Sequence, residues 1–203
     1  NLFKDSSFYG IEAEGMSPSE PSKVEIALTV LAGALGSSMY RDYVDSLDLA
    51  GNEQILDYGS GSGTPARYLA RRLLKNGGQV TCVDVSRVWM EVARQRLSRY
   101  TNVIFLQGEL ESLDLSDSSF DVVFVHFVLH DIPSERRMSV MSELARVLKS
   151  AGKLYLREPL RFISTVEVEQ LIAANRLVLE RASRGEIPTQ GVIFSGVYQK
   201  PAG

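Results

Sequence analysis

The stretch ILDYGSGSGTPARYLARRLL, residues 55–74, joins an apolar run, a glycine-rich turn and a helical pattern in direct succession. Ile55 and Leu56 end a buried strand, and Thr64 with Pro65 supplies the N-cap and first turn of a helix. The glycines between them remove side chains where a ligand must approach the backbone. This strand, turn and helix N-terminus predict a site for a phosphate or a carboxylate.

Apolar runs alternate with helical patterns along most of the chain. We expect strands at 54–58, 80–85, 103–106, 121–127 and 153–157, and helices at 65–75, 87–100 and 134–149. Uniformly apolar strands such as VVFV are typical of a parallel sheet that helices cover on both faces. A helix at 166–175 precedes two strand-like segments around the turn-like RGEIPTQG, residues 184–191. The predicted fold class is α/β, a doubly wound and mostly parallel sheet with an antiparallel C-terminal hairpin.

The N-terminal quarter of the chain differs from the rest. Residues 1–22 read as a loose arm, and helical patterns follow at 23–35 and 37–49. We expect residues 1–50 to cover the substrate site of a Rossmann-like domain formed by residues 51–203. With 203 residues and 44% hydrophobic composition, the whole is predicted to be one compact unit.

Composition limits the partners and the location. The net charge of -3 provides no positive field for holding a phosphate backbone, so nucleic acid is not an expected partner. The single cysteine, Cys82, lies in the apolar-flanked run VTCVDV and is typical of a reduced core thiol. The longest apolar stretch, residues 24–35, is too short to span a membrane. We expect a cytoplasmic protein.

Two carboxylates narrow the identity of the ligand. Asp57 immediately precedes the glycines, where it opposes a pyrophosphate and suits a cationic amino group. Asp84 ends the next strand, 21 residues after Gly63, where a ribose diol would donate two hydrogen bonds to it. A cofactor with an amino-acid end and a ribose satisfies both positions.

At these positions the sequence resembles the class I S-adenosylmethionine-dependent methyltransferases. Their first motif is an acidic residue followed by three alternating glycines, and VDVS (83–86) and QGELESL (107–113) resemble their ribose-binding and adenine-binding segments. The resemblance implies S-adenosyl-L-methionine as the cofactor. It also implies that the following residues contact the cofactor: Asp57, Gly59, Gly61, Gly63, Asp84, Val85, Trp89, Gly108, Glu109 and Leu110. Glu109 would meet the adenine amino group and Trp89 would stack on the ring, although a solvated acid and a core indole are the simpler readings of these two residues.

FDVVFVHFVLHDIP, residues 120–133, is similar to the fourth strand of the small-molecule branch, which includes ubiquinone and menaquinone biosynthesis methyltransferases. This resemblance implies a seven-stranded sheet whose last strand is antiparallel. The C-terminal hairpin predicted above agrees with it independently.

The two histidines of the chain, His126 and His130, follow the fourth predicted strand, at the sheet edge where open α/β sheets bind ligands. We expect a neutral His126 that lines the sulfonium side of the cofactor. His130, beside Asp131, is the candidate catalytic base, and the carboxylate would favour its protonated form. A purely structural role is the alternative for each histidine. Likewise, Tyr40 and Tyr43 could close over the methionine end of the cofactor or simply pack.

The absence of certain motifs disfavours several classes of methyl acceptor. No Asn/Asp-Pro-Pro-aromatic motif follows the fourth strand, no group of residues has metal-ligand spacing, and the position of Cys82 disfavours cytosine C5 and arsenic chemistry. We therefore expect a small-molecule acceptor and no metal, with the acceptor atom (O, N or C) open. Two alternatives remain. Gly61, Gly63 and Ala66 also fit the G-x-G-x-x-A motif of an NAD(P)-dependent oxidoreductase, and the chain could bind S-adenosylmethionine without catalysis.

Overall fold

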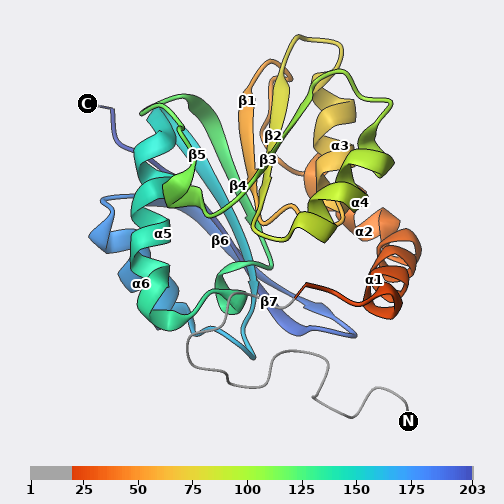
Figure 1. Cartoon of the computed structure of the whole chain (residues 1–203). Coiled ribbons are helices and arrows are strands. Elements are labelled where there is room, and N and C mark those ends of the chain that lie inside the picture. Colours follow the sequence, from red (N-terminus) through yellow and green to blue (C-terminus); the bar gives the residue numbers. More distant parts are fainter. Residues whose placement is uncertain (1–19, 203) are drawn as a thin grey trace.

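A seven-stranded sheet forms the centre of the computed structural model, which describes residues 20–202 (Figure 1). The strands are β1 (Gln54–Tyr58), β2 (Gln79–Asp84), β3 (Val103–Gln107), β4 (Phe120–His126), β5 (Leu148–Pro159), β6 (Val178–Ile187) and β7 (Gly191–Gln199). Their order is β3-β2-β1-β4-β5-β7-β6. β1 to β5 pair in parallel, whereas β7 is antiparallel to both β5 and β6. The predicted fold class is confirmed.

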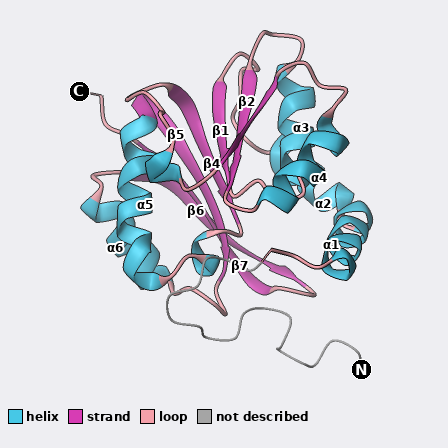
Figure 2. Cartoon of the chain, in the orientation of Figure 1, coloured by secondary structure: helices cyan, strands magenta, loops and turns pink. Residues whose placement is uncertain are grey.

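Helices cover both faces of the sheet (Figure 2). They are α1 (Lys23–Leu35), α2 (Ser37–Asp45), α3 (Thr64–Leu73), α4 (Arg87–Leu97), α5 (Ser134–Val147) and α6 (Thr165–Ala174), with short 3-10 turns η2 (Leu110–Ser112) and η3 (Leu129–Asp131). α1 to α4 lie on one side and α5 with α6 on the other, as expected for a doubly wound sheet.

The structure corrects several predicted boundaries. The fifth strand runs over Leu148–Pro159 and not 153–157, and the helix before it ends at Val147 and not at 149. The second N-terminal helix ends at Asp45 instead of Leu49. Arg72 of α3 donates to the carbonyls of Val44 and Asp45, and these contacts hold the end of the helix. The C-terminal hairpin is longer than predicted, because β6 and β7 stay paired up to Ile187 and Gly191, inside the segment read as a turn.

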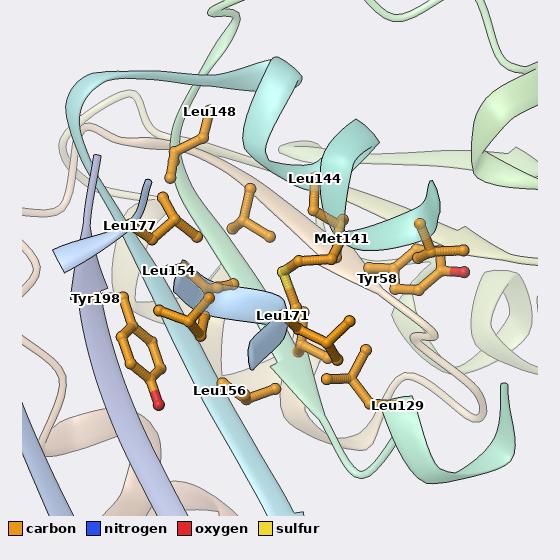
Figure 3. Close-up of a cluster of buried hydrophobic side chains, with 14 of the residues drawn as sticks. Tyr58, Leu129, Met141, Leu144, Leu148, Leu154, Leu156, Leu171, Leu177 and Tyr198 are labelled. Carbon is orange, nitrogen blue, oxygen red and sulfur yellow. The ribbon is translucent and has the colours of Figure 1, made fainter. Parts of the chain in front are cut away.

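Two hydrophobic clusters fill the layers. On one side, buried residues of α2, the following loop and α3 pack against the sheet, and Val44 is fully buried there. The N-terminal helix α2 thus shares a core with the rest of the domain. On the other side, α5 and α6 bury the cluster drawn in Figure 3, where Leu129 lies with Tyr58 and Met141. Leu129 anchors η3 to the core.

The connections from β1 and β4 leave the sheet in opposite directions. β1 leads by α3 to β2 on one side, whereas β4 leads by α5 to β5 on the other. Ligands of open α/β sheets bind at such a switch point, outside the carboxyl ends of the strands. No helix within residues 20–202 is long and apolar enough to cross a membrane.

Candidate active site

A cavity of about 190 Å³ opens at the carboxyl ends of β1 and β4. Its wall comes from α1, α2, the turn after β1, the end of β4, η3, and loop residues that follow β5 and precede β7. The structure brings five predicted site residues to this wall: Asp57, Gly59, Gly61, His126 and His130. Residues distant in the sequence, Phe162 and Gln190 among them, complete it.

The glycines of the turn after β1 serve different purposes. A Cβ atom at Gly59 would lie 2.5 Å from the side chain of Val128, so tight packing requires this glycine. At Gly61, where φ is +50°, a Cβ atom would meet nothing within 4 Å. Gly61 is therefore the position at which a missing side chain leaves room for a ligand. Gly63 is packed against Leu97 and does not line the cavity.

Asp57 is a buried acid whose side chain faces the cavity. Only 2% of the residue is exposed, and its Oδ2 atom has no hydrogen-bond partner within residues 20–202. Burial, together with the negative charge of Asp84, raises the pKa of Asp57 to about 7. Because a buried carboxylate without a partner is costly, this arrangement favours a bound cation such as an ammonium group.

Asp84 supports the same turn from β2. Its Oδ2 atom accepts a hydrogen bond from the backbone N–H of Gly61 at 2.8 Å, and its Oδ1 atom accepts one from Ser86 at 2.9 Å. Burial raises the pKa of Asp84. Each carboxylate oxygen can accept a second hydrogen bond, so contact with a ribose is compatible with these bonds. Glu20 lies nearby and accepts from the N–H of Arg87 at the start of α4.

Several predicted cofactor residues lie outside the cavity wall in the described structure: Asp84, Val85, Trp89, Gly108, Glu109 and Leu110. Leu110 is 1% exposed and packs in the core. Glu109 forms two hydrogen bonds with Arg136, at 3.0 and 2.9 Å, a partner that the sequence did not indicate. An adenine amino group would share the Glu109 carboxylate with this guanidinium, and the role of Glu109 stays a prediction.

His126 is the last residue of β4 and is enclosed by aromatic rings. Its ring centroid lies 5.4 Å from that of Tyr40, 5.5 Å from Tyr43 and 4.1 Å from Phe127. Burial, aided by the positive charge of Arg157, lowers the pKa of His126 to about 3. This lowered pKa agrees with the predicted neutral imidazole. Its physical cause is burial beside an arginine, whereas the sequence prediction relied on the cofactor's charge.

His130 lies in η3, where two carboxylates flank its ring. Its Nδ1 atom is 2.6 Å from Oε2 of Glu158, and its Nε2 atom is 3.4 Å from Oδ1 of Asp131. Burial alone would lower the pKa of His130, but the hydrogen bond to Glu158 and the charge of Asp131 outweigh it and leave the pKa raised. The predicted effect of a neighbouring carboxylate is confirmed, although the closer carboxylate is Glu158.

Glu158 was missed by the sequence analysis. It is fully buried, and its Oε1 atom accepts hydrogen bonds from the N–H groups of Val128 and Leu129, at 2.9 and 2.8 Å. One carboxylate therefore fixes both the backbone of η3 and the ring of His130. The available signal was an acidic residue at the carboxyl end of an apolar strand, directly before Pro159.

This geometry is capable of acid–base chemistry beside a bound cation. In the cavity wall, Asp57 offers an unpaired carboxylate. In the same wall, His130 presents an imidazole whose Nδ1 atom is held by Glu158, while its Nε2 atom, 3.4 Å from Asp131, is the one that can exchange a proton. Among residues 20–202, no cluster of three or more His, Cys, Asp or Glu side chains could hold a metal ion.

Comparison with known proteins places this site in a family. Residues 56–156 match the family model of the methyltransferase domain. An arsenite methyltransferase of Rattus norvegicus is 31% identical over 138 residues, 63% of this chain and 36% of that protein. A demethylmenaquinone methyltransferase of Clavibacter sepedonicus is 35% identical over 106 residues, 52% of this chain and 41% of that protein.

The chain belongs to the class I S-adenosylmethionine-dependent methyltransferases. S-adenosylmethionine is its cofactor. The chain spans between 35% and 52% of the length of the first curated relatives it matches. Among solved structures, the [4+2]-cyclase SpnF shares the fold with a TM-score of 0.70 and 18% identity, covering 82% of each chain.

Proposed function

We propose that the protein transfers the methyl group of S-adenosylmethionine to a small-molecule acceptor in the cavity at the ends of β1 and β4. One observation carries the proposal: a buried, unpaired Asp57 and the His130–Glu158 pair line or adjoin the same cavity. The first suits the ammonium group of the cofactor, and the second suits removal of a proton from the acceptor.

On the cofactor side, Asp57 binds the amino group and the turn around Gly61 contacts the amino-acid end. The N-terminus of α3 adds a partial positive charge that favours the carboxylate. Asp84 takes the ribose hydroxyls, Glu109 meets the adenine amino group and Trp89 stacks on the ring. Val85, Gly108, Leu110, Gly59 and Gly63 complete the cofactor contacts. The bound cofactor supplies an electrophilic methyl group on a sulfonium.

On the acceptor side, Nε2 of His130 takes the acceptor's proton while Glu158 holds the Nδ1–H group. This hydrogen bond fixes the tautomer and orients the ring, as second partners of catalytic histidines commonly do. His126 lines the sulfonium side as a neutral imidazole, so no second positive charge opposes the cofactor. Phe127 and Phe162 limit the access of water, and positioning supplies much of the rate.

The N-terminal segment, residues 1–50, covers the acceptor in this proposal. Thr29, Gly33 and Tyr40 contribute to the cavity wall, which supports that role, while residues 1–19 lie outside the described part of the chain. The acceptor is a small molecule and not nucleic acid, and arsenic is disfavoured because Cys82 is fully buried. We also propose a cytoplasmic location, which the single buried thiol supports.

The test combines binding with group transfer. Calorimetry should detect saturable binding of S-adenosylmethionine and its demethylated product, and no binding of NAD. Methyl-labelled cofactor should then pass its label to a compound in a small-molecule extract, and the Asp57→Ala variant should transfer none. Cofactor binding without transfer to any extract would favour the non-catalytic alternative. Transfer of label to nucleic acid alone would refute the small-molecule assignment.

A further inference from the structure

Arg157 of β5 is a charged residue that the proposed chemistry does not use. It pairs in register with His126 of the neighbouring parallel strand β4, so both side chains lie on the same face of the sheet. The guanidinium carbon lies 4.3 Å from the ring centroid of Tyr43 and 5.9 Å from that of Phe127. Arg157 therefore lies directly behind the aromatic wall of the cavity, because Phe127 and His126 both line it.

The guanidinium of Arg157 lacks the partners that buried arginines need. Its Nε and Nη1 atoms are buried, and neither has a hydrogen-bond acceptor within residues 20–202. No carboxylate of that part of the chain forms an ion pair with it. By contrast, Arg137, which is likewise half-buried, pairs with Glu167 at 2.6 Å. Buried polar groups in folded proteins are almost always satisfied, so the exception indicates a ligand.

The side chain next along β5 cannot supply the missing anion. Successive residues of a strand point to opposite faces, and the carboxylate of Glu158 is engaged by η3 and His130 on the other side. The remaining neighbours of Arg157 are aromatic rings and the neutral His126. Cation–π contacts offset only part of the cost of burying a guanidinium. Burial accordingly lowers the pKa of Arg157.

We propose that Arg157 binds an anionic group of the methyl acceptor, a carboxylate in the simplest case. This inference rests on the proposed function, in which the acceptor occupies the cavity between the cofactor and His130. An acceptor in that position meets His126 and Phe127, and an anionic substituent directed past the edge of the Phe127 ring reaches the guanidinium, whose carbon lies 5.9 Å from the centroid of that ring. The anion supplies the missing acceptors for Nε and Nη1 and balances the positive charges of Arg157 and the sulfonium.

This charge arrangement determines which acceptors are excluded. A cationic acceptor would face two like charges in a partly buried site, and a neutral one would leave the guanidinium unpaired. The aromatic neighbours Tyr43 and Phe127 favour an acceptor whose carboxylate is attached to a planar apolar group. Benzoate and its neutral isostere benzamide are therefore suitable probes.

The experiment measures binding of benzoate and benzamide to the protein saturated with S-adenosylhomocysteine. We expect benzoate to bind about 10-fold to 100-fold more tightly than benzamide, as a charge-assisted hydrogen bond predicts. Arg157→Gln should abolish this preference and Arg157→Lys should keep part of it. Arg184→Gln, which removes an exposed arginine of β6, is the matched control and should change nothing.

Three results would overturn the assignment: equal affinities of benzoate and benzamide, no binding of benzoate to the wild-type protein, or undiminished preference in Arg157→Gln. If Arg157→Gln does not fold, the proposal is still tested by the affinities of the wild-type protein and of Arg157→Lys for benzoate and benzamide. Affinity for S-adenosylhomocysteine is measured separately for each variant. If the wild-type protein does not bind S-adenosylhomocysteine, the proposed function is wrong. If it binds S-adenosylhomocysteine but does not prefer benzoate over benzamide, only the role of Arg157 is wrong.

Discussion

His126 and His130 are four residues apart in the sequence, yet the fold moves their pKa values in opposite directions. The pKa of His126 falls to about 3, and that of His130 rises above its usual value. Burial lowers the pKa of both histidines, and two consecutive residues of β5 then add opposite effects. Arg157 lies beside His126 and opposes its protonation, whereas Glu158 accepts a hydrogen bond from His130 and favours it.

The alternation of side chains along a strand explains how one dipeptide acts on both histidines. β5 is the parallel neighbour of β4, and Arg157 pairs in register with His126. Glu158 points to the opposite face, where η3 carries His130 back toward the end of the sheet. Burial and the charged residues of the adjacent strand thus together set the pKa values of the two histidines. The sequence positions of the histidines relative to each other do not reveal it.

The largest effect expected from this comparison is on the rate of transfer. Replacement of His130 by alanine should lower the single-turnover rate by about 100-fold to 10,000-fold, since a general base is lost. His126→Ala should lower it much less, because a neutral, enclosed imidazole takes no proton. His130→Ala should keep its cofactor affinity, measured by calorimetry. A wild-type rate for His130→Ala across pH 6 to 9 would show that proximity alone carries the reaction.

A smaller effect is expected from the cofactor side, where neither histidine acts. Asp84→Ala should weaken binding of S-adenosylmethionine by about 2–4 kcal/mol, or about 30-fold to 1,000-fold, because two charge-assisted hydrogen bonds are lost. Titration calorimetry measures this change directly. In the Asp84→Ala variant at saturating cofactor, the pH dependence of methyl transfer should be that of the wild-type protein. A changed pH dependence would contradict the assignment of proton transfer to His130. Unaltered affinity in the folded variant would assign Asp84 to holding the Gly61 turn alone.

The depressed pKa of His126 should appear in the stability of the protein. Between pH 6.5 and 3 the unfolded chain binds a proton that the folded protein does not, so the free energy of unfolding falls as the pH falls. From pH 7 to pH 5 this loss amounts to about 2 kcal/mol. His126→Phe should lack it, which urea denaturation at the two pH values can measure.

His130 should change the free energy of unfolding with pH in the opposite direction, so it is a control for that measurement. Its folded pKa is raised, so its contribution is fully present below the unfolded pKa and is lost as the pH rises through the folded value. His130→Phe should therefore increase the loss of stability from pH 7 to pH 5, whereas His126→Phe decreases it. Changes of the same sign in both variants would contradict the assignment of opposite environments.

The smallest expected effect is a shift in the pH profile of transfer. Glu158→Gln removes the charge that raises the pKa of His130, so the acid limb of the rate profile should move to lower pH. The single-turnover rate measured from pH 5 to 9 reports the shift. Glu143→Gln, which removes a charged partner of Arg146 on α5, is a matched control outside this pair. A lowered rate with an unmoved limb would indicate a structural role for Glu158.

Much of the fold, and the glycine-rich turn of the proposed cofactor site, could be predicted because the sequence patterns that indicate them are local. Asp57 and the glycines are encoded in one continuous turn, and the positive φ values of that turn restrict which residues can stand there. The alternation of apolar runs and helices indicated the sheet, and the hairpin followed from its turn residues. Boundaries failed where a distant residue decided them, as Arg72 does at the end of α2.

The sequence by itself determined the architecture, the cofactor turn and the placement of both histidines at the edge of the sheet. Tertiary structure alone decided their chemistry, because the partners come from β5, about thirty residues further along the chain. Burial and opposite charge set a pKa through distance in space, which a sequence pattern does not encode. The pairing of β4 with β5 therefore makes one histidine a wall of the site and the other its candidate base.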